Sequence, residues 1–517
     1  MAIWRTYYTH HPLWVEHAAN GIAANVGFFE LLTREGYWFT WTNSLATRGS
    51  LQPAVLGLVW PRLLWWPSSH ILVTALALCL FLILLVRFVR LRTGSDLLGL
   101  GTAVLFCTLG GLYNERNGMG VPWPDYQSMF FLSSAALSLG IYSLSARVGW
   151  LALAGGCVSL ATLARDTGAA YSVVICLPLF ALLLAREFSN GGGVRSVVKF
   201  GLWCGIPALP GIVLLLNKIQ FLRSYYMTSN AHQLRHPFGE ALRSIWDLSS
   251  AFSGIPVIVG MGLLLAGGLF AWPRRKWSVQ DIVVAYWPLS FFAFLLANGY
   301  TGDMTKEVMY MAPGFVCAAA TLGGGMDVRS RPARALLYSV LGVCLVGAGV
   351  SAMTAYTRAR NPPAGASALR SDQARMAEAL ASVPQRVVWS SFSSYDWGTV
   401  LSALTIYENG RYQPNNNSLF HNRKSYWDAA FPGMDLPTLQ ERVLAQAEAQ
   451  ADLAIVLKDP NQKPAGMEDY SFSIASYVAE HVRDSSGWRH IRDVDTSTAG
   501  PLAFYLNVRR MRPGSVP

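Results

Sequence analysis

Acidic and basic side chains gather at one set of ends of the long apolar segments in this sequence. The acids are Glu16, Glu30, Glu35, Glu115, Asp125, Asp166, Asp303 and Glu307. The bases near them are Arg116, Arg165 and Lys306. Carboxylates beside cations at helix ends can line a cavity between helices, where they could take part in acid–base or ion-binding chemistry. Alternatively, each of them only anchors a helix end at the interface, which costs little because the charge reaches water.

Asp125 stands out among these acids because the stretch WPDYQS predicts that a helix begins directly after Pro124. An Asp at this place can cap the helix by accepting a hydrogen bond from a backbone N–H group of its first turn. It would also project a carboxylate into any outward-facing cavity between the helices. Both interpretations stay open at this point.

The segments that must position these residues are membrane spans. The chain of 517 residues is 52% hydrophobic and 14% charged, and its mean hydropathy is +0.30. Soluble chains carry about 25% charged residues. An apolar run of about 20 residues can cross a bilayer as a helix. We expect about ten such spans, at 70–89, 96–113, 127–146, 149–164, 168–185, 199–217, 251–272, 281–298, 305–324 and 335–356.

Arg and Lys in the short loops predict the orientation of the spans. One set of loops holds most of them: Arg87, Arg90, Arg92, Arg147, Arg186, Arg195, Lys199, Arg274, Arg275, Lys276, Arg329, Arg331 and Arg334. These loops are therefore expected in the cytoplasm. Residues 114–126, 218–250 and everything after about 357 are expected outside. The net charge of +11 reflects this topology and gives no argument for a nucleic-acid partner.

The composition changes after residue 356. Strand-like stretches appear at 386–391, 452–457, 487–494 and 502–509, and helical patterns such as SDQARMAEALAS and LPTLQERVLAQAEAQ lie between them. Strands alternating with helices favour a small α/β domain. We expect three regions: an outer first loop with interfacial helices (1–69), a transmembrane helical domain (70–356) and a periplasmic α/β domain (357–517).

Neither disulfides nor a metal centre is predicted. All seven cysteines fall inside the apolar segments, where they are expected to fill the core. His10, His11 and His17 lie near Glu16, but they lack the i,i+4 spacing of a helical metal site. We predict no cofactor, with a divalent metal as the alternative.

The order of four loose motifs resembles the GT-C glycosyltransferases, in particular the bacterial protein-mannosyltransferase and aminoarabinose-transferase type. The motifs are TNSLATRGSLQPAVLGLVWPRLLWW, PDYQSMFFLSSAALSLGIYSLSA, the span pair containing Arg165 and Gly168, and TKEVMYMAPGFVCAAATLGG with Lys306, Tyr310 and Pro313. The resemblance covers roughly residues 10–356, and the outer α/β domain also fits it.

The family begins with a cytoplasmic N-terminus and a first span, which would lie upstream of Met1. We therefore expect an in-frame upstream stretch that encodes about 20 apolar residues; a truncated gene or a different fold is the alternative.

The resemblance implies a reaction and a set of site residues. Such enzymes take a sugar from a polyprenyl-phosphate carrier at the outer face of the cytoplasmic (inner) membrane and invert its anomeric centre. An acid in the first outer loop acts as the general base. Here this is Glu16, with Glu30 as the alternative, because the first 40 residues contain no Asp. Asp125 would orient the acceptor or the base, and Glu115 is a further catalytic candidate.

The same resemblance assigns the leaving phosphate to Arg165, Lys306 and Arg116, through charge-assisted hydrogen bonds. The acceptor would be an envelope glycan, lipid or protein.

Two other functions stay open. One is a transporter of lipid-linked sugars, although no paired halves with broken helices are visible. The other is a non-catalytic or decayed membrane protein with an extracytoplasmic binding domain, which the missing first span and the missing loop Asp favour.

Overall fold

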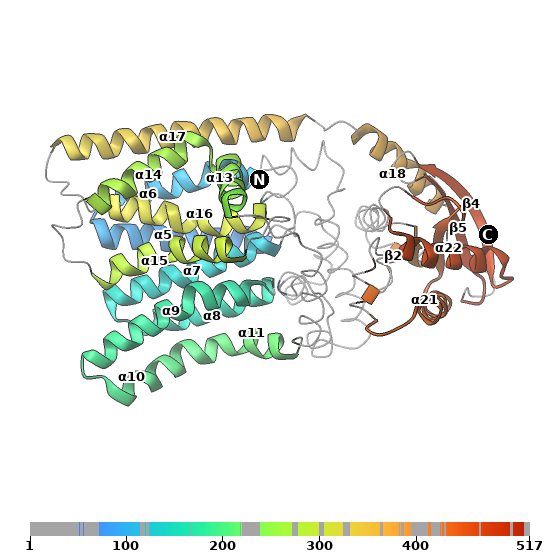
Figure 1. The fold of residues 1–517 in the computed structure, drawn as a ribbon, viewed down its shortest axis with the longest axis horizontal. Coiled ribbons are helices and arrows are strands. Elements are labelled where there is room, and N and C mark those ends of the chain that lie inside the picture. Colours follow the sequence, from blue (N-terminus) through green and yellow to red (C-terminus); the bar gives the residue numbers. More distant parts are fainter. Residues whose placement is uncertain are drawn as a thin grey trace.

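The structure is a computed structural model with a helical bundle and a small α/β domain (Figure 1). It describes residues 51, 55, 72–113, 119, 124–165, 167–217, 219, 238–270, 278–298, 304–323, 331–361, 366–381, 383, 387–393, 412–414, 424, 427–428, 431–464, 467–496 and 500–510.

The bundle consists of helices that follow the apolar segments of the sequence. Their bounds are α5 Leu72–Thr93, α6 Asp96–Cys107, η3 Gly110–Tyr113, α7 Pro124–Ser145, α8 Gly149–Ala164, α9 Thr167–Ser189, α10 Gly193–Phe200, η4 Gly201–Gly205, α11 Ile206–Asn217, α13 Phe238–Ser253, α14 Ile255–Phe270, α15 Val279–Asn298, α16 Met304–Gly323 and α17 Arg331–Arg360. Local signals fit these bounds. Ser95 caps α6 by accepting a hydrogen bond from the Leu98 N–H group, and Pro124 opens α7, where its missing N–H group costs nothing.

Every one of the ten expected spans overlaps a helix, but fewer helices are long and apolar enough to cross a membrane on their own. Within the described ranges five helices meet that condition, and a sixth is reached if α13 and α14 count as one bent span. Shorter apolar helices lie at Asp96–Cys107, Gly149–Ala164 and Val308–Leu322. The number of ten spans therefore stays a prediction.

Helix α7 is the centre of the bundle. It packs against α5, α8 and α9, and 83% of its most apolar window is buried inside the protein. Its buried face includes polar residues, among them Asp125, Gln127 and Ser128. Polar side chains inside a membrane bundle are uncommon and tend to mark functional positions. The first turn of α7 is therefore the part of the fold that the site must be built around.

Side-chain contacts sort the helix ends into two groups that agree with the alternation expected from the loop charges. At one end, Arg92 in the last turn of α5 pairs with Asp281 in the first turn of α15, and Arg87 lies over the ring of Trp150 in α8 at 4.6 Å. Arg186 at the end of α9 donates to the Ser143 carbonyl of α7. All the cations in these contacts belong to the loops expected in the cytoplasm.

The other ends of the helices meet around η3. The Tyr126 hydroxyl of α7 donates to the Gly111 carbonyl at 3.0 Å, and η3 packs against α17 near Ser351. Helix α17 then ends at Arg360, on the side of the bundle nearer to the α/β domain (Figure 1). The start of α7 and the α/β domain thus lie toward the same end of the bundle.

The α/β domain contains a five-stranded mixed sheet in the order β2-β1-β3-β5-β4. Strands β2, β1 and β3 are parallel, whereas β5 is antiparallel to both of its neighbours. The bounds are α18 Ala366–Ala381, β1 Val387–Phe392, β2 Tyr412–Pro414, α21 Leu436–Gln450, β3 Leu453–Leu457, α22 Asp469–Asp484, β4 Trp488–Thr496 and β5 Gly500–Asn507. All four strands expected from the sequence are present, and so are both helices; β2 and α22 were not expected.

Strict alternation along the central strands explains the layers of this domain. In β3, Leu453 and Ile455 face the core beneath α18, whereas Ala454 and Val456 face the core shared with α21 and α22. The sheet is therefore covered on both faces, which is why β3 reads as a continuous apolar run. The seven cysteines are all free. The expectation that they fill the core holds for Cys157, Cys176, Cys317 and Cys344, which are buried, whereas Cys79 is exposed.

Candidate active site

An ion pair joins the first turn of α7 to the end of α8. Arg165 Nη1 lies 3.0 Å from Asp125 Oδ2, and the two side chains are 14% and 3% exposed. Arg165 follows the last residue of α8, and its extended backbone carries the chain out of the helix. Because both side chains are buried, replacing one of them alone disrupts a buried ion pair, which is costly.

This geometry corrects one expectation about Asp125. Helix α7 begins at Pro124, so that Asp125 lies inside the first turn and is not the capping residue. Its carboxylate is 3% exposed and lies beside Arg165. The positive end of the α7 dipole adds to the stabilisation of the ionised carboxylate.

Three tyrosines help to fix the first turn of α7 in place. The Tyr310 hydroxyl of α16 donates to the main-chain carbonyl of Asp125 at 3.2 Å. The ring of Tyr171 from α9 packs edge-on against Tyr310, with centroids 4.7 Å apart. Tyr126 is anchored to Gly111. Because these contacts come from α9, α16 and η3, the position of the Asp125 carboxylate is set by several helices at once.

Gly168 permits the close approach that brings Arg165 to Asp125. A Cβ atom at Gly168 would lie 2.4 Å from the Ala161 carbonyl oxygen and 2.5 Å from Ser128 Oγ. The Gly168 N–H group donates to the Arg165 carbonyl at 2.9 Å, which closes the turn between α8 and α9. The spacing of Arg165 and Gly168 in the sequence thus has a structural reason, because only a residue without a side chain fits against both α7 and α8.

We expect Gly168→Ala to lower the free energy of unfolding by roughly 1–3 kcal/mol, because the added methyl group overpacks this junction. Gly156→Ala in α8 is the matched control, since a Cβ there would meet nothing within 4 Å. Thermal unfolding of the two purified variants in detergent compares them directly. Equal behaviour of both variants would contradict the close approach.

The structure does not describe the side chains of the other candidate site residues. Glu16, Glu30, Glu115 and Arg116 lie outside the described residues. Lys306 lies in the first turn of α16, one turn before Tyr310, and its side chain is outside the described set. Their roles stay predictions. The structure brings together Asp125 and Arg165, and it adds the hydroxyl of Tyr310.

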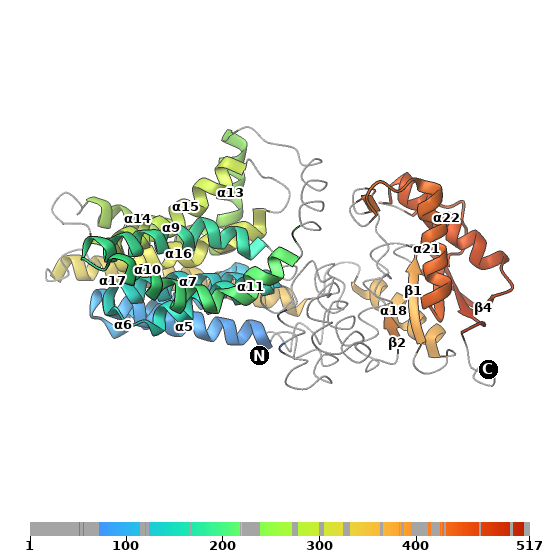
Figure 2. The same ribbon diagram turned by 90° about the horizontal axis from the view of Figure 1, so that it is seen from below.

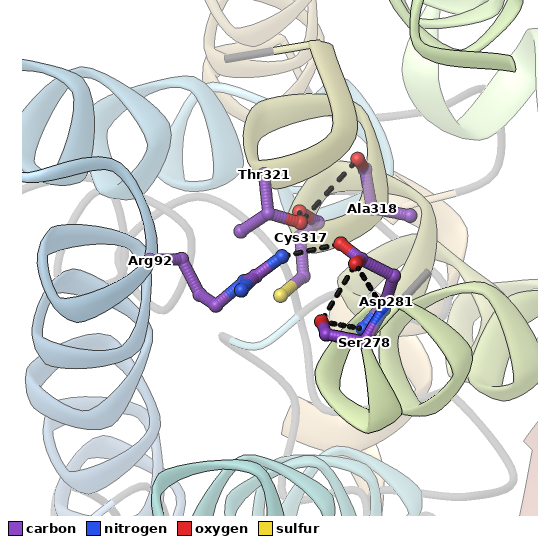
Figure 3. A network of polar contacts seen from close by, with 6 residues as sticks. All are labelled: Arg92, Ser278, Asp281, Cys317, Ala318 and Thr321. Carbon is purple, nitrogen blue, oxygen red and sulfur yellow. Dashed lines mark hydrogen bonds and ion pairs between the residues drawn. The ribbon is translucent and has the colours of Figure 1, made fainter. Parts of the chain in front are cut away.

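A second buried ion pair was not expected from the sequence. Arg92 Nη2 donates to Asp281 Oδ1, and the side chains are 11% and 3% exposed (Figure 3). The other carboxylate oxygen of Asp281 accepts from the Ser278 N–H group and the Ser278 hydroxyl, at 2.9 and 2.6 Å. Cys317 from α16 lies beside the pair (Figure 3). One feature of the sequence could have indicated this pair: Asp281 is the single acid at the start of the apolar segment 281–298, on the side where the loops are basic.

Within the described part of the chain, no three His, Cys, Asp or Glu residues are grouped closely enough to hold a metal ion. The chemistry that the described site offers comes from a carboxylate and a guanidinium. A guanidinium presents planar N–H donors that match the oxygens of a phosphate or a carboxylate. A carboxylate beside it fixes the orientation of those donors.

Comparisons with solved structures identify the fold. The apo structure of ArnT from Cupriavidus metallidurans matches this chain with a TM-score of 0.55 at 11% identity. The structure of the same protein bound to undecaprenyl phosphate matches with a TM-score of 0.53 at 12% identity. Each match covers 99% of this chain and 97% of ArnT. The apo oligosaccharyltransferase of Archaeoglobus fulgidus matches with a TM-score of 0.53 at 11% identity, over 92% of this chain and 76% of that enzyme. Neither a family model nor a curated protein sequence matches the chain.

The chain therefore has the fold of these solved structures, which agrees with the resemblance that the order of the sequence motifs indicated. The chain is a multi-pass helical membrane protein with a small mixed α/β sheet.

Proposed function

We propose that this protein is an inverting glycosyltransferase. It moves a sugar from a polyprenyl-phosphate donor to an envelope glycan, lipid or protein acceptor at the outer face of the bacterial cytoplasmic membrane. The observation that carries the proposal is the buried pair of Asp125 and Arg165 at one end of a GT-C bundle. The structure of ArnT with undecaprenyl phosphate supports a lipid phosphate as the donor's leaving group.

In the proposed reaction the acceptor hydroxyl attacks the anomeric carbon of the donor sugar. The bond from that carbon to the phosphate oxygen breaks, and polyprenyl phosphate leaves with the bonding electron pair. A single displacement of this kind inverts the anomeric centre. Glu16, or alternatively Glu30, takes the proton of the hydroxyl as general base. Glu115 and Asp125 are the further acids that orient the acceptor.

Arg165 is the proposed partner of the leaving phosphate, with Lys306 and Arg116. Hydrogen bonds from a guanidinium to phosphate oxygens strengthen as negative charge develops on them, so that they stabilise the transition state more than the ground state. Asp125 keeps the guanidinium in one orientation through the contact at 3.0 Å. No cofactor takes part in this proposal, since the lipid-linked sugar itself is the activated donor.

Mass spectrometry of the envelope glycans and lipids of a deletion strain tests the proposal. We expect one sugar modification to disappear, to return with the wild-type gene, and to stay absent with Asp125→Asn at equal protein level. Asp247→Asn is the control, because Asp247 is an exposed acid on α13. Identical profiles in all strains, grown under conditions in which the gene is expressed, would contradict the transferase function.

A further inference from the structure

Helix α13 lies in a segment that the sequence predicts as an outer loop. One of its faces packs against the bundle, where Ala241, Ile245 and Phe252 are buried and the neighbours are α16 and η3. A Cβ at Gly111 of η3 would overlap the ring of Phe252, so that this contact is close. The buried face therefore holds α13 beside the elements that anchor the first turn of α7.

A second face of α13 is apolar and exposed. Phe238, Leu242 and Trp246 are 67%, 43% and 49% exposed. Their spacing of four residues places them on one side of the helix, next to one another. A cluster of large apolar side chains with no protein cover inside the described structure needs an apolar environment.

A third face is charged and lies away from the apolar one. It carries Glu240, Arg243 and Asp247, and the side chains of Arg243 and Asp247 are 85% and 65% exposed around a contact of 3.8 Å. In the hydrocarbon core each of these charges would cost roughly 2.5–3.5 kcal/mol. This cost argues against α13 as the first half of a bent membrane span and favours a position at the boundary with water.

The sharp corner between α13 and α14 allows α13 to lie at the boundary between the membrane and water. The two helices are bent by 107°, and the turn is made at Gly254, whose φ of +86° suits glycine. Figure 2 shows α13 running across the direction of the neighbouring helices, while α14 lies along it. Exposed apolar residues continue beyond the corner, at Ile255 and Val259 of α14.

We propose that α13 is an interfacial helix that lies in the plane of the membrane. Phe238, Leu242 and Trp246 are embedded among the lipid acyl chains of the leaflet on the α/β-domain side, and the charged face meets the headgroups and water. The occupant of the apolar face is lipid because that face continues into α14, and because a helix with an apolar and a charged face binds at the interface. Trp is favoured at this depth.

Spin-label accessibility in lipid nanodiscs tests this arrangement on the full-length protein. Single cysteines at positions 238, 242 and 246, and as controls at 240, 243 and 247, are introduced into a variant whose seven native cysteines are replaced. Collision rates of the nitroxide with oxygen, which dissolves in lipid, and with a neutral nickel complex, which dissolves in water, report its depth. All six positions are exposed, so that the labels should not disturb folding; monodisperse elution and unchanged thermal unfolding check this.

The expected result is a shift toward oxygen at 238, 242 and 246 and toward nickel at 240, 243 and 247. A shift toward nickel at all six positions would place α13 in water and overturn the proposal. Low collision rates with both reagents at 242 and 246 would reveal a protein partner or a second copy, and would also overturn it. A shift toward oxygen at all six positions would make α13 part of a span, again against the proposal.

Discussion

Arg165→Gln is expected to lower the rate of sugar transfer by roughly 10²–10³-fold, the loss that follows removal of one donor to the charge that develops in a transition state. Arg165→Lys keeps the charge but loses the planar pair of donors, so that an intermediate rate is expected. The measurement is the rate at which the missing envelope product accumulates in the complemented deletion strain, at equal protein level.

The same substitution also removes the partner of a buried carboxylate, so that stability has to be separated from chemistry. Asp125 is 2% exposed, and a single substitution of either partner leaves an uncompensated charge that costs about 3–5 kcal/mol. The double variant Asp125→Asn with Arg165→Gln removes both charges. It is expected to regain most of the thermal stability and none of the transfer rate.

This contrast distinguishes the two possible roles of the pair. If the pair only holds α7 to α8, the double variant recovers activity together with stability, and Arg165 has no part in phosphate binding. Arg147→Gln serves as the matched control, because Arg147 is an exposed arginine at the opposite end of α7 and α8. It should leave both stability and transfer unchanged.

Asp281→Ala is expected to lower the free energy of unfolding by about 3–5 kcal/mol, because Arg92 would then remain buried without its counter-charge. The loss includes the hydrogen bonds from Ser278, which cap the first turn of α15. Replacing the pair together, as Arg92→Met with Asp281→Leu, removes both charges and fills similar volume. Most of the lost stability should therefore return. Unfolding of the purified variants in mixed detergent micelles measures the difference.

A neighbouring exposed pair provides the control for this prediction. Arg90 in the last turn of α5 and Asp96 in the first turn of α6 lie 2.9 Å apart, with side chains 64% and 66% exposed. Exposed pairs contribute about 0–1 kcal/mol, so that Asp96→Asn should have little effect. Equal losses from Asp281→Ala and Asp96→Asn would show that burial of the Arg92 pair does not govern the stability of this end of the bundle.

The sequence alone determined which segments are helical and how their ends alternate, because both depend on local quantities. A run of apolar residues has one stable state in a membrane, and the helix is the structure that satisfies its backbone. The strands β1, β3 and β5 were visible for a similar reason, since their apolar and β-branched runs match a sheet covered on both faces. Strand β4 was also expected, although it lies at the edge of the sheet and most of its residues are not buried. Helix α22 was missed, although Ile474, Val478 and Val482 have the i,i+4 spacing of its buried face.

Only the tertiary structure decided which charges meet. Arg165 was a phosphate candidate and Asp125 a separate acid, and nothing in their spacing of 40 residues indicated a contact at 3.0 Å. Arg92 was one cation among many that marked topology, and its pairing with Asp281 joins residues 189 positions apart. The physical reason is that the charges in the loops follow from the orientation of each span in the membrane, which the local sequence reveals. A buried ion pair, in contrast, forms only where the packing of helices has removed the water around both side chains.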